Sequence, residues 1–144
     1  MYDADYMQWI AVTVEKLRHQ NFEQVDWANL IEEIEDIGKR ERRSLKSNLI
    51  VLLLHLLKWP YQPTQSTGSW AGSIVEPRRR IEEALKDSPS LKPYLEQIFA
   101  EAYQDMLKQA AAETMLDIKT LPSECEFALT QVIEEGFLPS NRAA

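Results

Sequence analysis

The stretch WANLIEEIEDIGKRERRSLKSNLIVLLLHLLKW, from Trp27 to Trp59, decides the fold, because it holds no proline and a single glycine, Gly38. Nothing in it forbids helix until the Trp59–Pro60 step, so we expect one helix of about thirty residues. At a rise of 1.5 Å per residue, that helix is roughly 45–50 Å long. Gly38 costs about 1 kcal/mol relative to alanine and marks the expected bend or break.

The apolar residues of this helix recur at helical spacing and predict its core face. Asp26 is the expected N-cap, and the acidic residues of the first turns suit the positive end of the helix dipole. From Leu49 to Leu57 the helix is apolar nearly all round, so we expect neighbouring helices to enclose this half. At 100° per residue one stripe collects the expected core residues Trp27, Leu30, Ile31, Ile34, Leu45, Leu49, Leu52 and Leu56.

The rest of the chain also has helical patterns, separated by proline and serine signals. We expect helices over Tyr6 to His19, from Trp70 onward with a kink or a division into two short helices at Pro77, over Ser88 to about Ala112, and over Glu124 to Glu135. The expected caps are Asp3 or Asp5, Ser69, Ser88 with Pro89 at the first helical position, and Gly136 at the final C-terminus. The sequence therefore predicts an all-α fold, a small bundle of about five helices in a single domain, residues 1–144.

The composition of the chain argues against several classes of protein. The chain has 144 residues and a net charge of −7, which opposes non-specific binding to nucleic acids and anionic membranes. Its one cysteine, Cys125, cannot form an internal disulfide. The N-terminus has no signal-peptide pattern, and no apolar run approaches the ~20 residues that span a bilayer. We expect a soluble cytoplasmic protein without membrane contact.

A polar cluster at the end of the long helix is the best candidate site. His55 and Lys58 stand among leucines, and a loop bounded by Pro60 and Pro63 follows. On one interpretation His55 satisfies its ring nitrogens internally and only fixes how the helices meet. On the other, imidazole, ammonium and guanidinium groups between flat indole walls bind a ligand or a partner. The residues that we would test are Glu33, His55, Lys58, Trp59, Ser69, Trp70 and Arg79; a helical wheel places Arg78 nearer the buried face than Arg79 or Arg80.

At these residues the chain resembles a known family. The segments DWANLIEEIEDIGKRERRSLKSNL, HLLKWPYQP, SW, EPRRRIEEAL, SPSL, AAET and GFLP resemble the domain of unknown function 29 family, found mostly in cyanobacteria. The resemblance covers nearly the whole chain and implies a small helical bundle in the bacterial cytoplasm, without an activity to carry over. The chain departs from the family pattern at Pro60 and Pro77. Matching positions are Asp26, Asn29, Leu30, Glu32, Glu33, Gly38, His55, Lys58, Trp59, Gln62, Pro63, Ser69, Trp70, an arginine within 78–80, Ser88, Pro89, Leu91 and Glu113.

Two functions of different kinds remain open. The first is a protein-interaction or small assembly module, with a protein partner or a homodimer. The second is an RNA-binding protein or a metal-independent ribonuclease that uses His55 as general acid or base, with Arg42, Arg43, Lys46 and Arg78 to Arg80 as cations. We expect no metal and no cofactor, because the chain has no Glu-x-x-His pair, no phosphate loop and no dinucleotide fingerprint.

Overall fold

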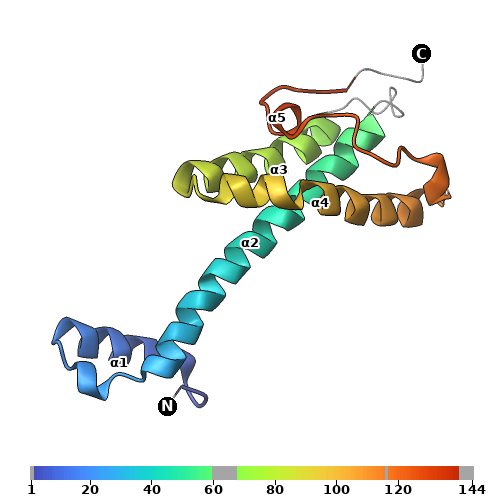
Figure 1. Ribbon diagram of the computed structural model, residues 1–144. Coiled ribbons are helices and arrows are strands. Elements are labelled where there is room, and N and C mark those ends of the chain that lie inside the picture. Colours follow the sequence, from blue (N-terminus) through green and yellow to red (C-terminus); the bar gives the residue numbers. More distant parts are fainter. Residues whose placement is uncertain (1, 60–67, 116, 140–144) are drawn as a thin grey trace. The chain divides into compact units, whose positions relative to one another are not determined.

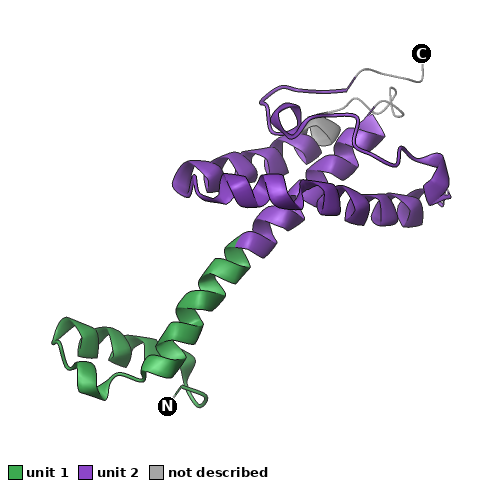
Figure 2. Ribbon diagram, viewed as in Figure 1, with its two compact units in different colours: residues 1–41 green, residues 42–144 purple. Residues whose placement is uncertain are grey.

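The computed structural model describes residues 2–59, 68–115 and 117–139, and side chains of residues 68–71 lie outside the description. The described chain contains helices and no strand, which confirms the all-α prediction (Figure 1). It divides into two compact units, residues 1–41 and 42–144, and α2 contributes to both (Figure 2). The elements are α1 (Tyr6–Arg18), η1 (Phe22–Gln24), α2 (Trp27–Lys58), α3 (Gly68–Asp87), α4 (Leu91–Thr114), η4 (Ile118–Thr120) and α5 (Leu129–Val132).

Unit 1 consists of α1, η1 and the first part of α2. Asp5 is the N-cap of α1, since its carboxylate accepts a hydrogen bond of 3.0 Å from the backbone N–H of Gln8. Buried Trp9, Thr13 and Val25 form its interior. Such a small unit has few side chains with which to cover the apolar residues of α2.

Helix α2 is a single helix, as predicted, and it is not broken at Gly38. Asp26 caps it as predicted, because its carboxylate accepts a hydrogen bond of 3.3 Å from the N–H of Asn29. The predicted core stripe is only half right. The residues from Leu45 onward are buried, whereas Trp27, Ile31 and Ile34 are 45%, 53% and 60% exposed. Periodicity identifies an apolar face but does not supply the neighbours that cover it.

Unit 2 has the main hydrophobic core, built by the second part of α2 together with α3, α4 and α5. Lys46 of α2 bridges Glu101 at 3.1 Å and Asp105 at 3.2 Å on α4, which orients the two helices. The side chains that are almost fully buried are Leu45, Leu49, Leu52, Leu56, Ile74, Ile81, Leu95, Met106 and Val132. This core holds the candidate site at the end of α2.

Two boundary predictions in unit 2 are wrong, the starts of α3 and α4. Helix α3 begins at Gly68, so Ser69 lies in its first turn. Of the two alternatives expected at Pro77, the division into two helices does not occur, because α3 is continuous from Gly68 to Asp87. Proline removes one backbone hydrogen bond, and the buried side chains on either side, Ile74 and Ile81, hold the helix together across that point. Helix α4 begins at Leu91, because the Ser88 carbonyl accepts the N–H of Leu91 in a turn that precedes the helix.

The final helix is also shorter than predicted, with α5 limited to Leu129–Val132. The preceding segment lies along α4 instead, where the Tyr103 hydroxyl donates to the carbonyl of Pro122 at 2.7 Å and the Gln104 amide donates to the carbonyl of Ser123 at 2.9 Å. These two hydrogen bonds hold the residues just before the predicted start at Glu124 against α4. Burial raises the pKa of Tyr103 to about 12.

Candidate functional site

His55 lies in the last turn of α2 and is partly buried in unit 2. Its Nδ1 atom is buried and has no hydrogen-bond partner among the described residues. Burial lowers the pKa of His55, the nearby Lys58 ammonium lowers it further, and Glu113 opposes both. The ring is therefore neutral near pH 7, with one buried nitrogen facing no described partner.

Lys58 and Glu113 form a close ion pair beside His55. The Lys58 ammonium donates to Glu113 Oε2 at 2.6 Å, and the Gln109 amide donates to Glu113 Oε1 at 3.2 Å. The hydrogen bond from Lys58, followed by the one from Gln109, holds the pKa of Glu113 below its usual value. The pair joins α2 to α4, so it fixes the packing of two helices as well as the charge next to His55.

The other residues predicted for this cluster are not brought together with His55 and Lys58 by contacts between described side chains. Trp59 packs, partly buried, against the core of unit 2. The side chains of Ser69 and Trp70, and residues 60–67, for which the sequence predicts a loop, lie outside the described residues. Arg79 is on the surface of α3, where it pairs with Glu76 at 2.8 Å and Glu83 at 2.7 Å. These carboxylates raise the pKa of Arg79.

The buried arginine of this triplet is Arg78, as the helical wheel indicates; it is only 4% exposed. Its Nε donates to the carbonyl of Val132 at 3.1 Å and its Nη2 to the carbonyl of Phe137 at 2.9 Å. Burial lowers the pKa of the guanidinium, while Glu82 and Glu134 oppose that change. Arg78 thus connects the C-terminal segment to α3 through hydrogen bonds from its guanidinium to backbone carbonyls.

Glu33, the candidate nearest the N-terminus, makes its contacts inside unit 1. Its two carboxylate oxygens accept hydrogen bonds from the hydroxyls of Tyr2 and Tyr6. These bonds, that of Tyr2 first, lower the pKa of Glu33, and its carboxylate raises the pKa of Tyr2 to about 12. Trp9 packs edge-on against the Tyr2 ring at 4.9 Å between centroids, so Glu33 helps to close the small core of unit 1.

Sequence reasoning missed two residues of the His55 cluster. Glu113 appears in the family resemblance, but its contact with Lys58 spans 55 positions of sequence and has no local signal. Gln109 lies four residues before Glu113 on α4, a spacing that places both on one helix face. No group of three or more metal-ligating side chains occurs in the described part of the chain.

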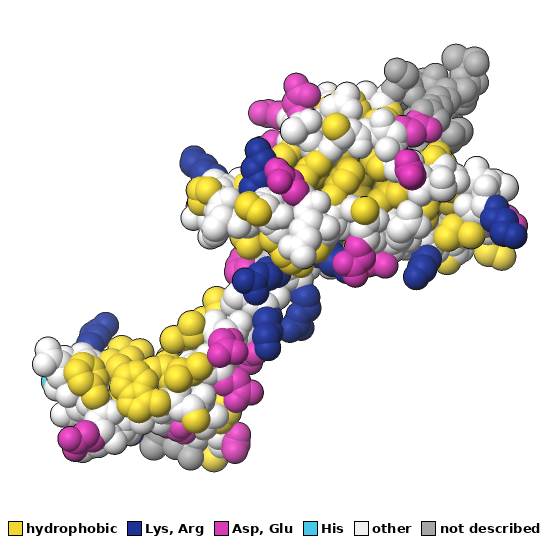
Figure 3. Space-filling view, viewed as in Figure 1, with side chains coloured by type: hydrophobic (Ala, Val, Ile, Leu, Met, Phe, Trp, Pro, Cys, Tyr) yellow, Lys and Arg dark blue, Asp and Glu magenta, His cyan; other side chains and the backbone are white. Residues whose placement is uncertain are grey.

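Unit 1 has an exposed feature of a different kind, which we call the apolar stripe: Phe22, Trp27, Ile31 and Ile34. The rings of Phe22 and Trp27 lie 6.4 Å apart, and the Trp27 indole N–H donates to the carbonyl of Phe22 at 2.9 Å. Trp27, Ile31 and Ile34 then follow one face of α2, and Ile37, 54% exposed, lies one turn beyond. Hydrophobic side chains gather on the face of unit 1 seen in Figure 3.

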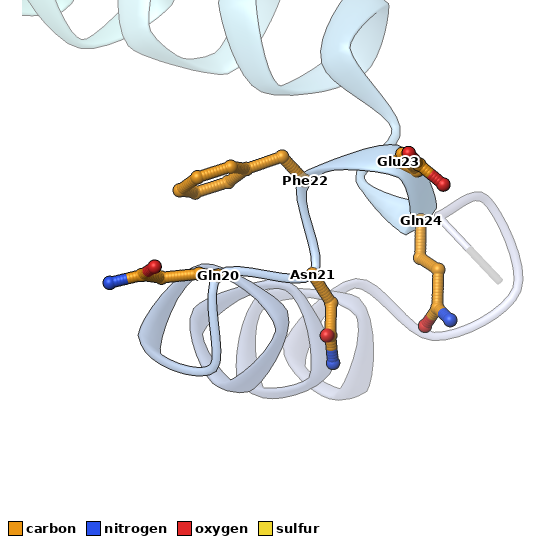
Figure 4. Close-up of a pocket in the computed structure, with 5 residues that line it drawn as sticks. All are labelled: Gln20, Asn21, Phe22, Glu23 and Gln24. Carbon is orange, nitrogen blue, oxygen red and sulfur yellow. The ribbon is translucent and has the colours of Figure 1, made fainter.

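A pocket of about 290 Å³ adjoins Phe22, lined by the five consecutive residues Gln20 to Gln24. Their side chains point in different directions and do not converge on one point (Figure 4). Ligand sites generally have polar groups aimed at a common centre. We therefore regard this pocket as a weaker candidate for a binding site than the apolar stripe.

These observations define a small all-α protein with an apolar stripe on unit 1 and a neutral histidine beside an ion pair in unit 2. The model of the family described as "Domain of unknown function DUF29" matches residues 1–138, and the chain belongs to that family. No curated protein and no solved structure matches the chain. None of the helices in the described residues is both long and apolar enough to cross a membrane.

Proposed function

We propose that this protein is an interaction module that binds a partner protein through the apolar stripe of unit 1. The observation that carries the proposal is the exposure of Trp27, Ile31 and Ile34, which are 45–60% exposed on one helix face although their spacing is that of a core face. Fully burying an isoleucine stabilises a complex by about 1.5–3 kcal/mol, so each half-exposed isoleucine has of the order of 1 kcal/mol to contribute. Contiguous exposed apolar surface of this kind marks interaction sites.

Four cations of unit 2, Lys46, Lys58, Arg79 and Arg80, support this choice over RNA binding. Lys46 bridges two carboxylates of α4, Lys58 pairs with Glu113, and Arg79 and Arg80 share Glu76. Each of these cations is already neutralised by a carboxylate of the chain, which weakens attraction to phosphates. The His55 cluster we interpret as a contact between α2 and α4, and we expect the module to work in the cytoplasm, where a lone thiol stays reduced.

The test is affinity purification of the tagged full chain from the cells that produce it, with quantitative mass spectrometry. The test variant combines Ile31→Ser with Ile34→Ser. The control is Val75→Ser, since Val75 is a single exposed aliphatic residue, 58% exposed, on α3 of unit 2. Circular dichroism first establishes that all three proteins are equally helical.

We expect a stoichiometric partner with the wild type and with Val75→Ser, and its loss with the double variant. Recovery of the same proteins by all three chains would refute the proposal. So would a light-scattering mass of one chain at micromolar concentration without any co-purifying protein.

A further inference from the structure

The charge of the chain is divided very unevenly between its units. Residues 1–41 contain ten aspartates and glutamates and four lysines and arginines, a formal charge of −6 out of the total of −7. The other 103 residues therefore carry −1. The unit with the apolar stripe is thus the strongly acidic one, and any partner of the stripe approaches a negative potential.

Two carboxylates of α2 lie closer to the Trp27 side of the helix than the lysine and arginine that unit 1 has on this helix. At about 100° per residue, Glu35 lies about 80° from Trp27 on one side of α2, and Glu41 lies about 40° from it on the other. Glu23 follows Phe22 in the sequence, but its side chain points away from the Phe22 ring (Figure 4). Lys39 and Arg40 lie more than about 100° away from Trp27, on other sides of the helix.

The cations of α1 are engaged elsewhere in unit 1. The Lys16 ammonium donates to the carbonyl of Gln24 at 3.0 Å, and Arg18 lies 3.9 Å from Glu15. The next cation along α2, Arg42, is a residue of unit 2 and lies 6.0 Å from the ring centre of Tyr94. The border of the stripe is therefore acidic and has no cation of unit 1 directed at it among these contacts.

We infer that the partner of the stripe is a cationic amphipathic helix, a segment of another protein with apolar residues on one face and lysines or arginines along its edges. A helix lays apolar residues at i, i+3, i+4 and i+7 against such a stripe, and its edge cations meet Glu35 and Glu41. A second copy of the chain would bring an equally acidic border against this one, so like-charge repulsion opposes self-association here. The inference rests on the proposed function and adds the chemistry of the partner.

The test measures binding of two fluorescent 15-residue peptides to the full chain by anisotropy. Both have leucine at i, i+3, i+4 and i+7 spacing; one has lysine at the other positions and the second has glutamate. The protein variants are the Ile31→Ser/Ile34→Ser pair, Glu35→Gln at the border, and Glu96→Gln as a matched control on the exposed surface of α4.

We expect the lysine peptide to bind at least about tenfold more tightly than the glutamate peptide, and to weaken as salt rises. The double serine variant is expected to lose about thirtyfold in affinity, because two apolar contacts are removed. Glu35→Gln is expected to lose about two- to threefold, and Glu96→Gln to bind like the wild type.

The outcomes separate the two proposals. Equal binding of both peptides, lost in the double serine variant, would overturn the cationic partner and leave the interaction function intact. Lysine-peptide binding that survives in the double serine variant would show attraction to net charge alone and overturn both. A light-scattering mass of two chains that falls to one in the double serine variant would identify a second copy as the occupant and overturn the cationic helix.

Discussion

Replacing Arg78 with methionine should loosen the C-terminal segment of unit 2. Arg78 as a residue is 4% exposed, and its guanidinium donates to two backbone carbonyls, those of Val132 and Phe137, at 3.1 and 2.9 Å. Hydrogen bonds from a charged donor contribute about 1.5–3 kcal/mol each, and their loss leaves both carbonyls unsatisfied. Methionine also removes a buried charge, which offsets part of the loss, so we expect a destabilisation of about 2–4 kcal/mol.

The neighbouring arginine supplies the control for this experiment. Arg79→Met removes the same chemical group one residue further on, where the side chain is half exposed and pairs with Glu76 and Glu83. Exposed pairs contribute little to stability, so its urea midpoint should stay close to that of the wild type. Arg78→Lys should fall between the two, because one ammonium replaces a two-pronged donor.

The assay combines urea unfolding, followed by circular dichroism at 222 nm, with hydrogen exchange of the amides of residues 129–137. Arg78→Met should lower the midpoint and speed exchange across this segment, and Arg79→Met should do neither. Equal midpoints and equal exchange for Arg78→Met and Arg79→Met would refute the reasoning that Arg78 holds the segment through its carbonyls.

Three further predictions concern α2. The pKa of His55 in the folded chain is below its unfolded value of about 6.5, so the neutral ring contributes its full stabilisation above that pH and less as the pH falls below it. His55→Gln should therefore flatten the dependence of the urea midpoint on pH between about pH 7.5 and 5. An unchanged slope would contradict this prediction. Lys58→Met should let the pKa of Glu113 rise toward its usual value in a carboxyl NMR titration, whereas an unmoved titration would mean that the ion pair does not persist in solution. Gly38→Ala should stabilise the chain by up to about 1 kcal/mol in urea, since a methyl group there meets nothing within 4 Å beyond its chain neighbours and the backbone of its own helix. A loss of stability would reveal a contact at this position.

The sequence predicted which segments form helices better than it predicted where those helices begin and end. The long helix and its cap Asp26 follow from the absence of proline and from side-chain chemistry, both of which act locally. Of the two alternatives expected at Pro77, a kink or a division, the division does not occur, because the buried neighbours Ile74 and Ile81 belong to a core that no local pattern describes. Tertiary packing overrides the cost of one lost backbone bond.

The apolar stripe shows the same limit on a larger scale. Ile34 and Leu45 lie on one predicted face of α2, yet Leu45 is only 2% exposed, in the core of unit 2, and Ile34 is 60% exposed. The spacing of apolar residues in the sequence predicts an apolar helix face, but it does not predict whether another element of the fold covers that face. The same holds for Lys58, which the sequence singled out while its partner Glu113 remained unidentified.

The central claim is that the apolar stripe is a contact surface for another protein. The most direct test is photo-crosslinking in living cells, with a benzophenone amino acid at position 34 and, as the control, at position 75, which is comparably exposed in unit 2. We predict a discrete adduct of the chain with one other protein from Ile34 and none from Val75. The same adducts from both positions, or none from either, would contradict the account.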